Sequence, residues 1–272
     1  KSGGPAPAEP PGERKAFDAE YNMSPEYERW LEEFDQALTD HGTTRTEYTI
    51  VRLKQDEYYL ISAGAWTAYD YDFLQKSADD WMAAGKGQID IHDVTTQWGV
   101  YALAGPNARA LLRDIVKDAD PDTVLSNKRF PWLSYRDIEL GMCPVRAIRV
   151  AYTGELGWEL HYPIEFGRYL WDLILKAGEK HGLKPVGARA QNWLRQEKSY
   201  RAFGNELGRD ATPLEAALDR FVDLTKDFRG KQKMLDTGIR SKCVTLLIDG
   251  PSDTDPWGKE ALIHDGIKVG RL

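Results

Sequence analysis

The hydrophobic pattern near the N-terminus is that of one amphipathic helix. Ser24 precedes Pro25, which is a typical N-cap and first-turn pair, and Gly42 supplies a helix stop. Large apolar residues recur between them at helical spacing: Tyr27, Trp30, Leu31, Phe34 and Leu38. The preceding segment, Lys1–Ala16, is rich in Pro and Gly and has too little apolar surface to offset the entropy of ordering. We therefore predict a flexible arm followed by a helix over residues 24–42.

The pattern then changes to short strand-like runs. Residues 48–53 and 58–62 are rich in β-branched and aromatic side chains and flank a polar stretch, Lys54–Glu57. This arrangement predicts a β-hairpin. A helical period follows over residues 67–84 and ends at Gly85.

Strand and helix signals remain mixed along the rest of the chain. Pro163 leads one of the helical stretches, and Asn107 is a candidate N-cap for another. The predicted strands span residues 100–103, 146–152, 158–162, 244–248 and 267–269, and the predicted helices span residues 107–117, 163–182 and 188–199. This mixture predicts an α+β fold.

Composition and charge exclude several classes of protein. A length of 272 residues is compatible with about two domains, and 42% hydrophobic with 29% charged residues is typical of a folded globular chain. The net charge of −7 argues against a broad binding surface for nucleic acid or anionic membrane. No uncharged stretch is long enough for a transmembrane helix. From the charge and from this absence together, we expect neither nucleic acid nor membrane as a partner.

The cysteines and histidines give little sign of metal chemistry. Cys143 and Cys243 are far apart and form no Cys-x-x-Cys pair, which suits a reducing compartment. We expect a cytoplasmic location, with the mitochondrial matrix as the alternative. The five histidines lack ligand spacing, so we expect no metal site. Gly85-Lys86-Gly87 lacks the rest of a dinucleotide fingerprint, and no Gly-x-Ser-x-Gly sequence is present.

The most informative stretch for chemistry runs from Arg149 to Tyr162. Tyr152 is expected at the end of one strand and Glu159 in the next, so a turn between them would place a phenol and a carboxylate on one wall. A carboxylate can accept two hydrogen bonds from an N–H beside an amino group, which is the edge that pterins and guanines present. The alternative is that Glu159 is a solvated strand residue.

Several motifs in order resemble the folate-binding aminomethyltransferase family. They are Arg146-Ala-Ile-Arg-Val150, Gly154-Glu-Leu-Gly-Trp-Glu159, Ala188-Arg-Ala-Gln-Asn-Trp-Leu-Arg-Gln-Glu197, Thr212-Pro-Leu-Glu-Ala216 and Asp227-Phe-Arg-Gly-Lys231. The family includes the T-protein of the glycine cleavage system and the C-terminal halves of dimethylglycine and sarcosine dehydrogenases, which these motifs resemble most. The likeness covers residues 42–272.

The resemblance implies a set of site residues. Glu159 is similar to the carboxylate that grips the pterin edge, and Tyr152 to the tyrosine that lines the folate pocket. Thr49 resembles a pocket threonine. Arg189 resembles a folate-contacting arginine, with a structural ion pair to Glu197 or Glu206 as its alternative role. Arg195 and Glu197 are expected to belong to the scaffold.

The catalytic residue of the family is altered in this chain. An Asp on the first hairpin strand serves as acid/base in the family, and the residue at that position here is Glu47. Glutamate keeps the charge and moves it by one methylene, so proton transfer is retained only if the carboxylate still reaches the reacting nitrogen. An exposed strand-end glutamate is the alternative. We expect Glu47 and Tyr152 to be the catalytic residues.

The resemblance also implies a domain organisation. We expect a flexible arm over residues 1–16, a folate-binding aminomethyltransferase-like domain over residues 17–241, and the start of a C-terminal β-barrel over residues 242–272. The family's N-terminal Asp-Val/Leu-Ser-like motif is not found in residues 1–46, and the barrel ends early. We therefore expect either a fragment of a longer chain or a reduced relative.

The reaction implied is one-carbon transfer from a methylated amine to tetrahydrofolate, giving methylene-tetrahydrofolate. The oxidation that precedes it requires FAD, which would come from a missing half or a partner, because this chain lacks Gly-x-Gly-x-x-Gly. Two alternatives stay open. One is a folate-dependent O- or S-demethylase, and the other is a non-catalytic structural or regulatory relative.

Overall fold

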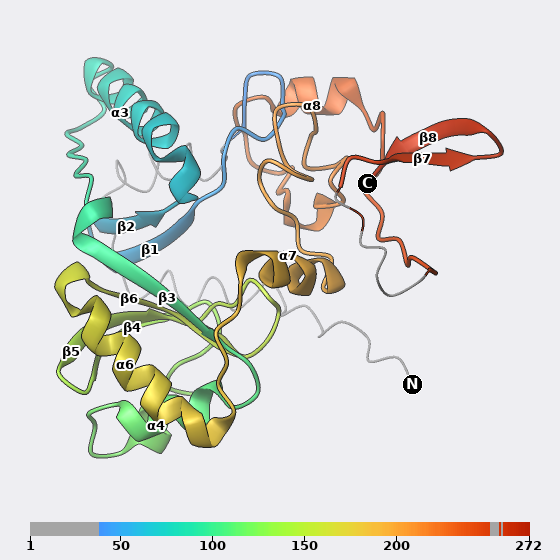
Figure 1. The fold of residues 1–272 in the computed structure, drawn as a ribbon. Helices are drawn as coiled ribbons and strands as arrows, with labels where there is room; N and C mark the ends of the chain where they lie inside the picture. The colour runs from blue at the N-terminus through green and yellow to red at the C-terminus, as the bar shows by residue number, and fades with distance from the viewer. Residues whose placement is uncertain (1–37, 251–255, 257) are drawn as a thin grey trace.

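A computed structural model describes residues 38–250, residue 256 and residues 258–272 (Figure 1). The predicted arm and residues 24–37 of the first predicted helix lie outside these ranges. The last part of that helix prediction is wrong, because Leu38 and Thr44 form an antiparallel bridge around a turn. Gly42 in this turn has a φ of 74°, a left-handed conformation that glycine adopts without strain.

A four-stranded antiparallel sheet forms the centre of the fold, with the strand order β3-β6-β5-β4. Its strands are β3 (Trp98–Ala104), β4 (Tyr135–Leu140), β5 (Cys143–Ile148) and β6 (Gly157–Pro163). Glu159 on β6 lies opposite Ala102 on one side and Ile148 on the other. β6 is therefore an interior strand.

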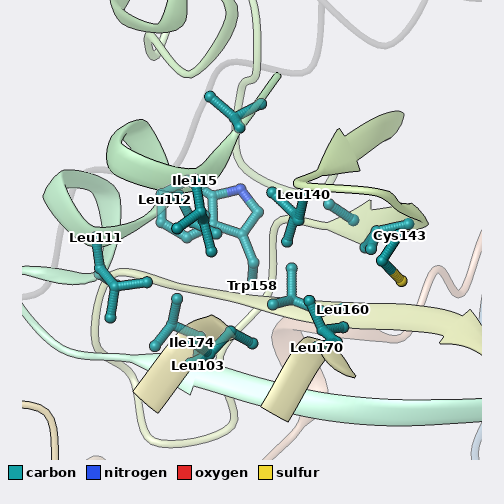
Figure 2. Close-up of a cluster of buried hydrophobic side chains, with 14 of the residues drawn as sticks. Leu103, Leu111, Leu112, Ile115, Leu140, Cys143, Trp158, Leu160, Leu170 and Ile174 are labelled. Atoms are coloured by element: carbon teal, nitrogen blue, oxygen red, sulfur yellow. The ribbon is translucent and has the colours of Figure 1, made fainter. Parts of the chain in front are cut away.

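One face of this sheet packs against helices α4 (Ala108–Ile115) and α6 (Gly167–Gly178). Alternate side chains of β6, Trp158 and Leu160, point to this face and are almost completely buried. Figure 2 shows them among leucine and isoleucine side chains from the two helices, including Leu111, Leu112, Leu170 and Ile174. Burial of each such side chain stabilises the fold by about 1.5–3 kcal/mol. This is the larger of the two apolar clusters among the described residues, and we call it the main core.

The hairpin of β1 (Thr49–Lys54) and β2 (Glu57–Ile61) contacts the sheet through aromatic and polar side chains. The Tyr59 ring lies 5.5 Å from the His161 ring and 6.1 Å from the Trp98 ring, measured between centroids. Tyr135 donates a hydrogen bond of 3.2 Å to the carbonyl of Leu53. Because His161 alternates with Leu160 along β6, these contacts lie on the face opposite the main core.

Helix α3 (Thr67–Ala83) follows the short 3-10 helix η1 (Gly64–Trp66) and lies beside the hairpin (Figure 1). Leu74, Ala78 and Trp81 recur at helical spacing and are buried. They form a second apolar cluster with Ile89, against which Leu60 and Tyr48 pack.

The C-terminal third contains helices α7 (Ala188–Glu197) and α8 (Lys231–Thr237) and a hairpin of β7 (Ala261–His264) and β8 (Ile267–Arg271). The predicted strand at residues 244–248 is wrong. These residues form no helix or strand, and Val244, Leu246, Leu247 and Ile248 are all exposed. The short remaining elements are α5 (Pro121–Val124), η2 (Thr95–Gln97), η3 (Ile164–Phe166), η4 (Glu179–His181) and η5 (Asp219–Phe221).

The α+β class is confirmed, as are the first predicted hairpin and the four predicted helices that correspond to α3, α4, α6 and α7. Asn107 is the N-cap residue of α4, as predicted, but its side chain makes no capping hydrogen bond and instead donates a hydrogen bond of 3.1 Å to the carbonyl of His181. The predicted position of Tyr152 at the end of a strand is wrong, since β5 ends at Ile148. In the described part of the chain, no helix is long and apolar enough to cross a membrane.

Candidate functional site

A buried arginine on α7 joins the segments around the candidate catalytic residues. Arg195 is 1% exposed. Its guanidinium donates to Asn192 Oδ1 at 2.8 Å, to the Tyr200 carbonyl at 2.7 Å and to Glu206 Oε2 at 2.8 Å. The N–H of Ala202 donates to the same Glu206 oxygen at 3.0 Å. A buried guanidinium is stable only when it is paired and hydrogen-bonded in this way, so Arg195 is part of the scaffold, as expected.

Glu47 lies near this arginine, two residues before β1. Its side chain retains solvent-accessible surface. Surrounding protein nevertheless desolvates the carboxylate and raises the pKa of Glu47 above its usual value, while a hydrogen bond from the N–H of Phe203 and the charge of Arg195 oppose the rise. A carboxylate that is both reachable and partly desolvated can exchange a proton with a bound molecule. Thr49 begins β1 opposite Ile61 and is also exposed.

Tyr152 lies in the loop after β5 and belongs to the same group. Its hydroxyl donates a hydrogen bond of 3.0 Å to the carbonyl of Arg201, and the residue is 38% exposed. Burial raises the pKa of the Tyr152 phenol, Arg195 lowers it, and the negative charges of Glu47 and Glu206 raise it further. These electrostatic interactions show that the structure brings Tyr152, Glu47 and Arg195 together.

Glu159 lies on β6 and has different neighbours. Its Oε2 is 3.5 Å from His161 Nε2, and its side chain is 31% exposed. The negative charge of Glu159 raises the pKa of Tyr59, whose largest perturbation is burial. The carboxylate is thus partly accessible to solvent at the face of the sheet that carries the hairpin.

Comparison with known proteins gives the chain a family. Residues 33–226 match the model of the GCVT N-terminal domain, and these residues are most of the chain. The chain belongs to the GCVT N-terminal domain family. It is 35% identical over 240 residues to mitochondrial dimethylglycine dehydrogenase of Rattus norvegicus, covering 86% of this chain and 27% of that protein. It is 32% identical over 230 residues to an aminomethyltransferase of Natranaerobius thermophilus, covering 78% of this chain and 60% of that enzyme.

The fold agrees with this family. The structure is similar to the crystal structure of the glycine cleavage system aminomethyltransferase T from Bartonella henselae, with a TM-score of 0.57 and 24% identity over 74% of this chain and 50% of that one. The chain spans about a quarter of the length of the dehydrogenases that it matches, and up to 60% of the length of the aminomethyltransferases. The resemblance seen in the sequence motifs is confirmed.

Arg189 lies on the same helix as Arg195 in this GCVT domain, in its first turn, and is exposed. The two arginines are six positions apart on the helix, a rise of about 9 Å. Glu206, which was one expected partner for Arg189, forms its ion pair with Arg195 instead.

Two residues of the site were missed in the sequence. His161 and Tyr59 contact each other, and His161 faces Glu159, but none of the sequence motifs includes this contact. A signal was present for His161, because it is two positions after Glu159 on a strand and so lies on the same face. No group of three or more His, Cys, Asp and Glu residues within residues 38–250 or the described C-terminal hairpin could hold a metal ion.

Proposed function

We propose that this chain is the tetrahydrofolate-dependent one-carbon transfer part of a dehydrogenase-type enzyme that acts on a methylated amine resembling dimethylglycine or sarcosine. The product would be methylene-tetrahydrofolate and the demethylated amine. Membership of the GCVT N-terminal domain family and the similarity to enzymes named dimethylglycine dehydrogenase, sarcosine dehydrogenase and aminomethyltransferase support this proposal.

The observation that carries the proposal is the environment of Glu47. This carboxylate is accessible, yet surrounding protein desolvates it and raises the pKa of Glu47 above its usual value, which makes it a stronger base. The hydrogen bond from the N–H of Phe203 and the charge of Arg195 act in the opposite direction and lower the pKa. We assign to Glu47 the proton transfer at the reacting amine nitrogen, and to Tyr152 the shaping of the adjacent wall.

The donor set fits a reduced folate. Glu159 offers a partly accessible carboxylate with lone pairs for the N–H and amino groups of a pterin edge. Tyr152 presents an accessible aromatic ring, and Arg189 and Thr49 are exposed at the starts of α7 and β1. When bound, tetrahydrofolate would supply the nucleophilic nitrogen that accepts the one-carbon unit. The protein would contribute chiefly by proximity, holding the two reactants together.

The oxidation step is assigned to a flavin outside this chain. The dehydrogenases that the chain resembles are about three times as long as this chain, and no dinucleotide-binding fingerprint occurs in these 272 residues. We therefore place FAD in a further portion of the enzyme or in a partner. The substrate amine would be oxidised there before the transfer step.

The test compares Glu47→Gln with Glu47→Asp in the enzyme that contains this chain. We expect Glu47→Gln to keep tetrahydrofolate affinity within a few-fold but to lower one-carbon transfer by roughly 100- to 10,000-fold, the range for loss of general acid/base assistance. Glu47→Asp should retain transfer, since it keeps the carboxylate and shortens the arm. Glu57→Gln on the neighbouring β1–β2 hairpin is the matched control, because Glu57 is half-exposed and pairs only with Lys54 in the described contacts.

Two outcomes would contradict the proposal. Transfer by Glu47→Gln at the parental rate would remove Glu47 from the proton-transfer step. Failure of the parental protein to bind tetrahydrofolate in calorimetry would favour a non-catalytic member of the family. The product distinguishes the reaction class, since methylene-tetrahydrofolate indicates oxidative transfer and methyl-tetrahydrofolate indicates O- or S-demethylation.

A further inference from the structure

A buried histidine lies between the hairpin and the carboxylate that we assign to folate binding. His161 is 0% exposed on β6. Its Nδ1 is 3.1 Å from the hydroxyl of Tyr59 on β2, and its Nε2 is 3.5 Å from Oε2 of Glu159. One imidazole ring therefore faces Tyr59 with one nitrogen and Glu159 with the other.

The position of the imidazole ring is fixed from several sides. The Tyr59 ring meets it edge-on at an interplanar angle of 84°. Arg146 lies directly opposite His161 in the β5–β6 pairing, and its guanidinium sits 5.3 Å from the Tyr59 ring centroid and 5.6 Å from the Trp98 ring centroid. Asp137 on β4 pairs with this arginine at 3.1 Å. The ring is held in a packed aromatic and charged layer rather than in an open space.

One nitrogen of this ring is left without a hydrogen bond. His161 Nε2 is buried and has no hydrogen-bond partner among the described residues, and Glu159 is at ion-pair distance only. A buried polar nitrogen without a partner is costly, and a small rotation of the Glu159 side chain would satisfy it. Hydrogen bonds that support ligand binding are often long before the ligand is present and shorten in the complex.

The chemistry of the three groups fixes the direction of the proton chain. An ionised carboxylate only accepts hydrogen bonds, so Nε2 of a neutral imidazole must carry the hydrogen that faces Glu159. Nδ1 is then the acceptor, and the Tyr59 hydroxyl donates to it. The chain Tyr59, His161, Glu159 has a donor and an acceptor at each step. Glu159 Oε2 can accept from His161 and still use its second lone pair for a ligand.

We propose that His161 is the positioning residue for Glu159: its Nε2–H holds the carboxylate in the orientation that receives the pterin N–H and amino groups, and Tyr59 fixes the imidazole tautomer. This inference rests on the proposed function, because it requires Glu159 to contact the folate. A second layer of hydrogen bonds that orients a binding carboxylate raises affinity by reducing the ordering required on binding.

The experiment compares two amide replacements that differ only in reach. The amide nitrogen of His161→Gln lies near the position of Nε2 and can donate to Glu159, whereas that of His161→Asn lies near the position of Nδ1 and cannot. Anaerobic calorimetry with tetrahydrofolate should give a Kd within about three-fold of the parental value for the Gln variant. We expect a Kd about ten-fold higher for the Asn variant, the effect of one hydrogen bond to a charged group.

The same pair in a Glu159→Gln background separates positioning from a structural role. There His161→Asn should change the Kd by less than about two-fold, because the charged acceptor is gone. Equal losses in both backgrounds, equal weakening by Asn and Gln, or parental affinity for His161→Asn would each overturn the proposal. If His161→Asn fails to fold in thermal melts, Tyr59→Phe replaces it in the same cycle, with a smaller loss expected in the parental background only.

The proposed function and this inference fail in different ways. Parental affinity in Glu159→Gln itself would mean that Glu159 does not bind folate, which overturns the folate assignment and the inference with it. A weakened Glu159→Gln combined with a parental Kd for His161→Asn would overturn the positioning role alone and leave the folate site in place.

Discussion

The carboxylate of Glu215 allows a quantitative test of the fold, because it is both buried and fully hydrogen-bonded. It is 2% exposed. Its oxygens accept from the N–H of Thr212 at 2.9 Å and from Arg240 through the backbone N–H at 3.0 Å, Nε at 2.8 Å and Nη2 at 2.7 Å. Its own N–H donates to Thr212 Oγ1 at 3.2 Å, which completes a capping box. The test replaces this carboxylate with a neutral amide in the variant Glu215→Gln.

The magnitude follows from the pKa. Hydrogen bonding to Arg240 is the largest effect and lowers the pKa of Glu215 from 4.5 to about 2, although burial opposes it. This difference corresponds to about 3 kcal/mol of stability at 1.36 kcal/mol per pH unit. The Arg240 side chain is 55% exposed, so solvent screens part of the interaction. We expect Glu215→Gln to lower the free energy of unfolding by about 2–3 kcal/mol at pH 7.

The stabilisation by Glu215 depends on pH. Because the folded-state pKa is below the unfolded value, the stabilisation is fully present above pH 4.5 and is lost as the pH falls toward about 2. Urea unfolding of the parental and Glu215→Gln proteins should therefore differ most at pH 7 and converge near pH 2. Glu57→Gln, at a half-exposed position, is the control and should stay within about 0.5 kcal/mol. If the two proteins differed equally in free energy of unfolding at pH 7 and pH 3, or did not differ at pH 7, the ionised Glu215 carboxylate would not be the source of the stability.

Three further outcomes are expected. Arg195→Met should raise the pKa of Glu47, because it removes a positive charge that lowers this pKa. The midpoint of the pH–rate profile measures the change, and an unmoved midpoint would argue against an interaction between Arg195 and Glu47. Burial raises the pKa of the Cys143 thiol to about 11, so Cys143 should react with a thiol reagent only on unfolding, whereas the partly exposed Cys243 should react in the native protein. Leu160→Ala should cost about 2–5 kcal/mol in denaturant unfolding, and a loss below 1 kcal/mol would place it outside the core.

The helices were predicted well because their apolar spacing is a local property. The pattern over residues 67–84 corresponds to α3 (Thr67–Ala83), and the stretch at residues 188–199 corresponds to α7 (Ala188–Glu197). In α3 the buried side chains lie three and four positions apart, so no information from the rest of the chain is needed. The first hairpin was predicted for the same reason, since its strands are adjacent in sequence.

Two strand predictions failed for different reasons. β4 (Tyr135–Leu140) was missed although its partner β5 follows after only two residues, because Arg136 and Asp137 interrupt the alternation of apolar and polar positions. The apolar run at residues 244–248 is a good strand pattern, but no strand among the described residues pairs with it. A strand forms only where a neighbour accepts its backbone hydrogen bonds, and the pattern of one segment does not specify that neighbour.

The arrangement of the candidate site residues also could not be predicted from local sequence. The sequence placed Tyr152 and Glu159 on one wall by assuming that both lie on adjacent strands. In the structure Glu159 lies opposite Ile148, and Tyr152 belongs to a loop whose electrostatic partners are Arg195 and Glu47. The group is assembled from segments more than 40 residues apart, so only tertiary structure could reveal it. Whether these residues bind folate stays a prediction.

The two faces of β6 carry different kinds of side chain, one for the main core and one for the candidate site. Trp158 and Leu160 point into the main core, while Glu159 and His161 point to the hairpin side. Because side chains alternate with a period of two, a slip of one residue would place the carboxylate and the imidazole in the apolar core. The cost of burying those groups there fixes the register of β6. The packing of Trp158 and Leu160 therefore determines the face of the sheet on which Glu159 and His161 lie, so stabilising the core also places the candidate site.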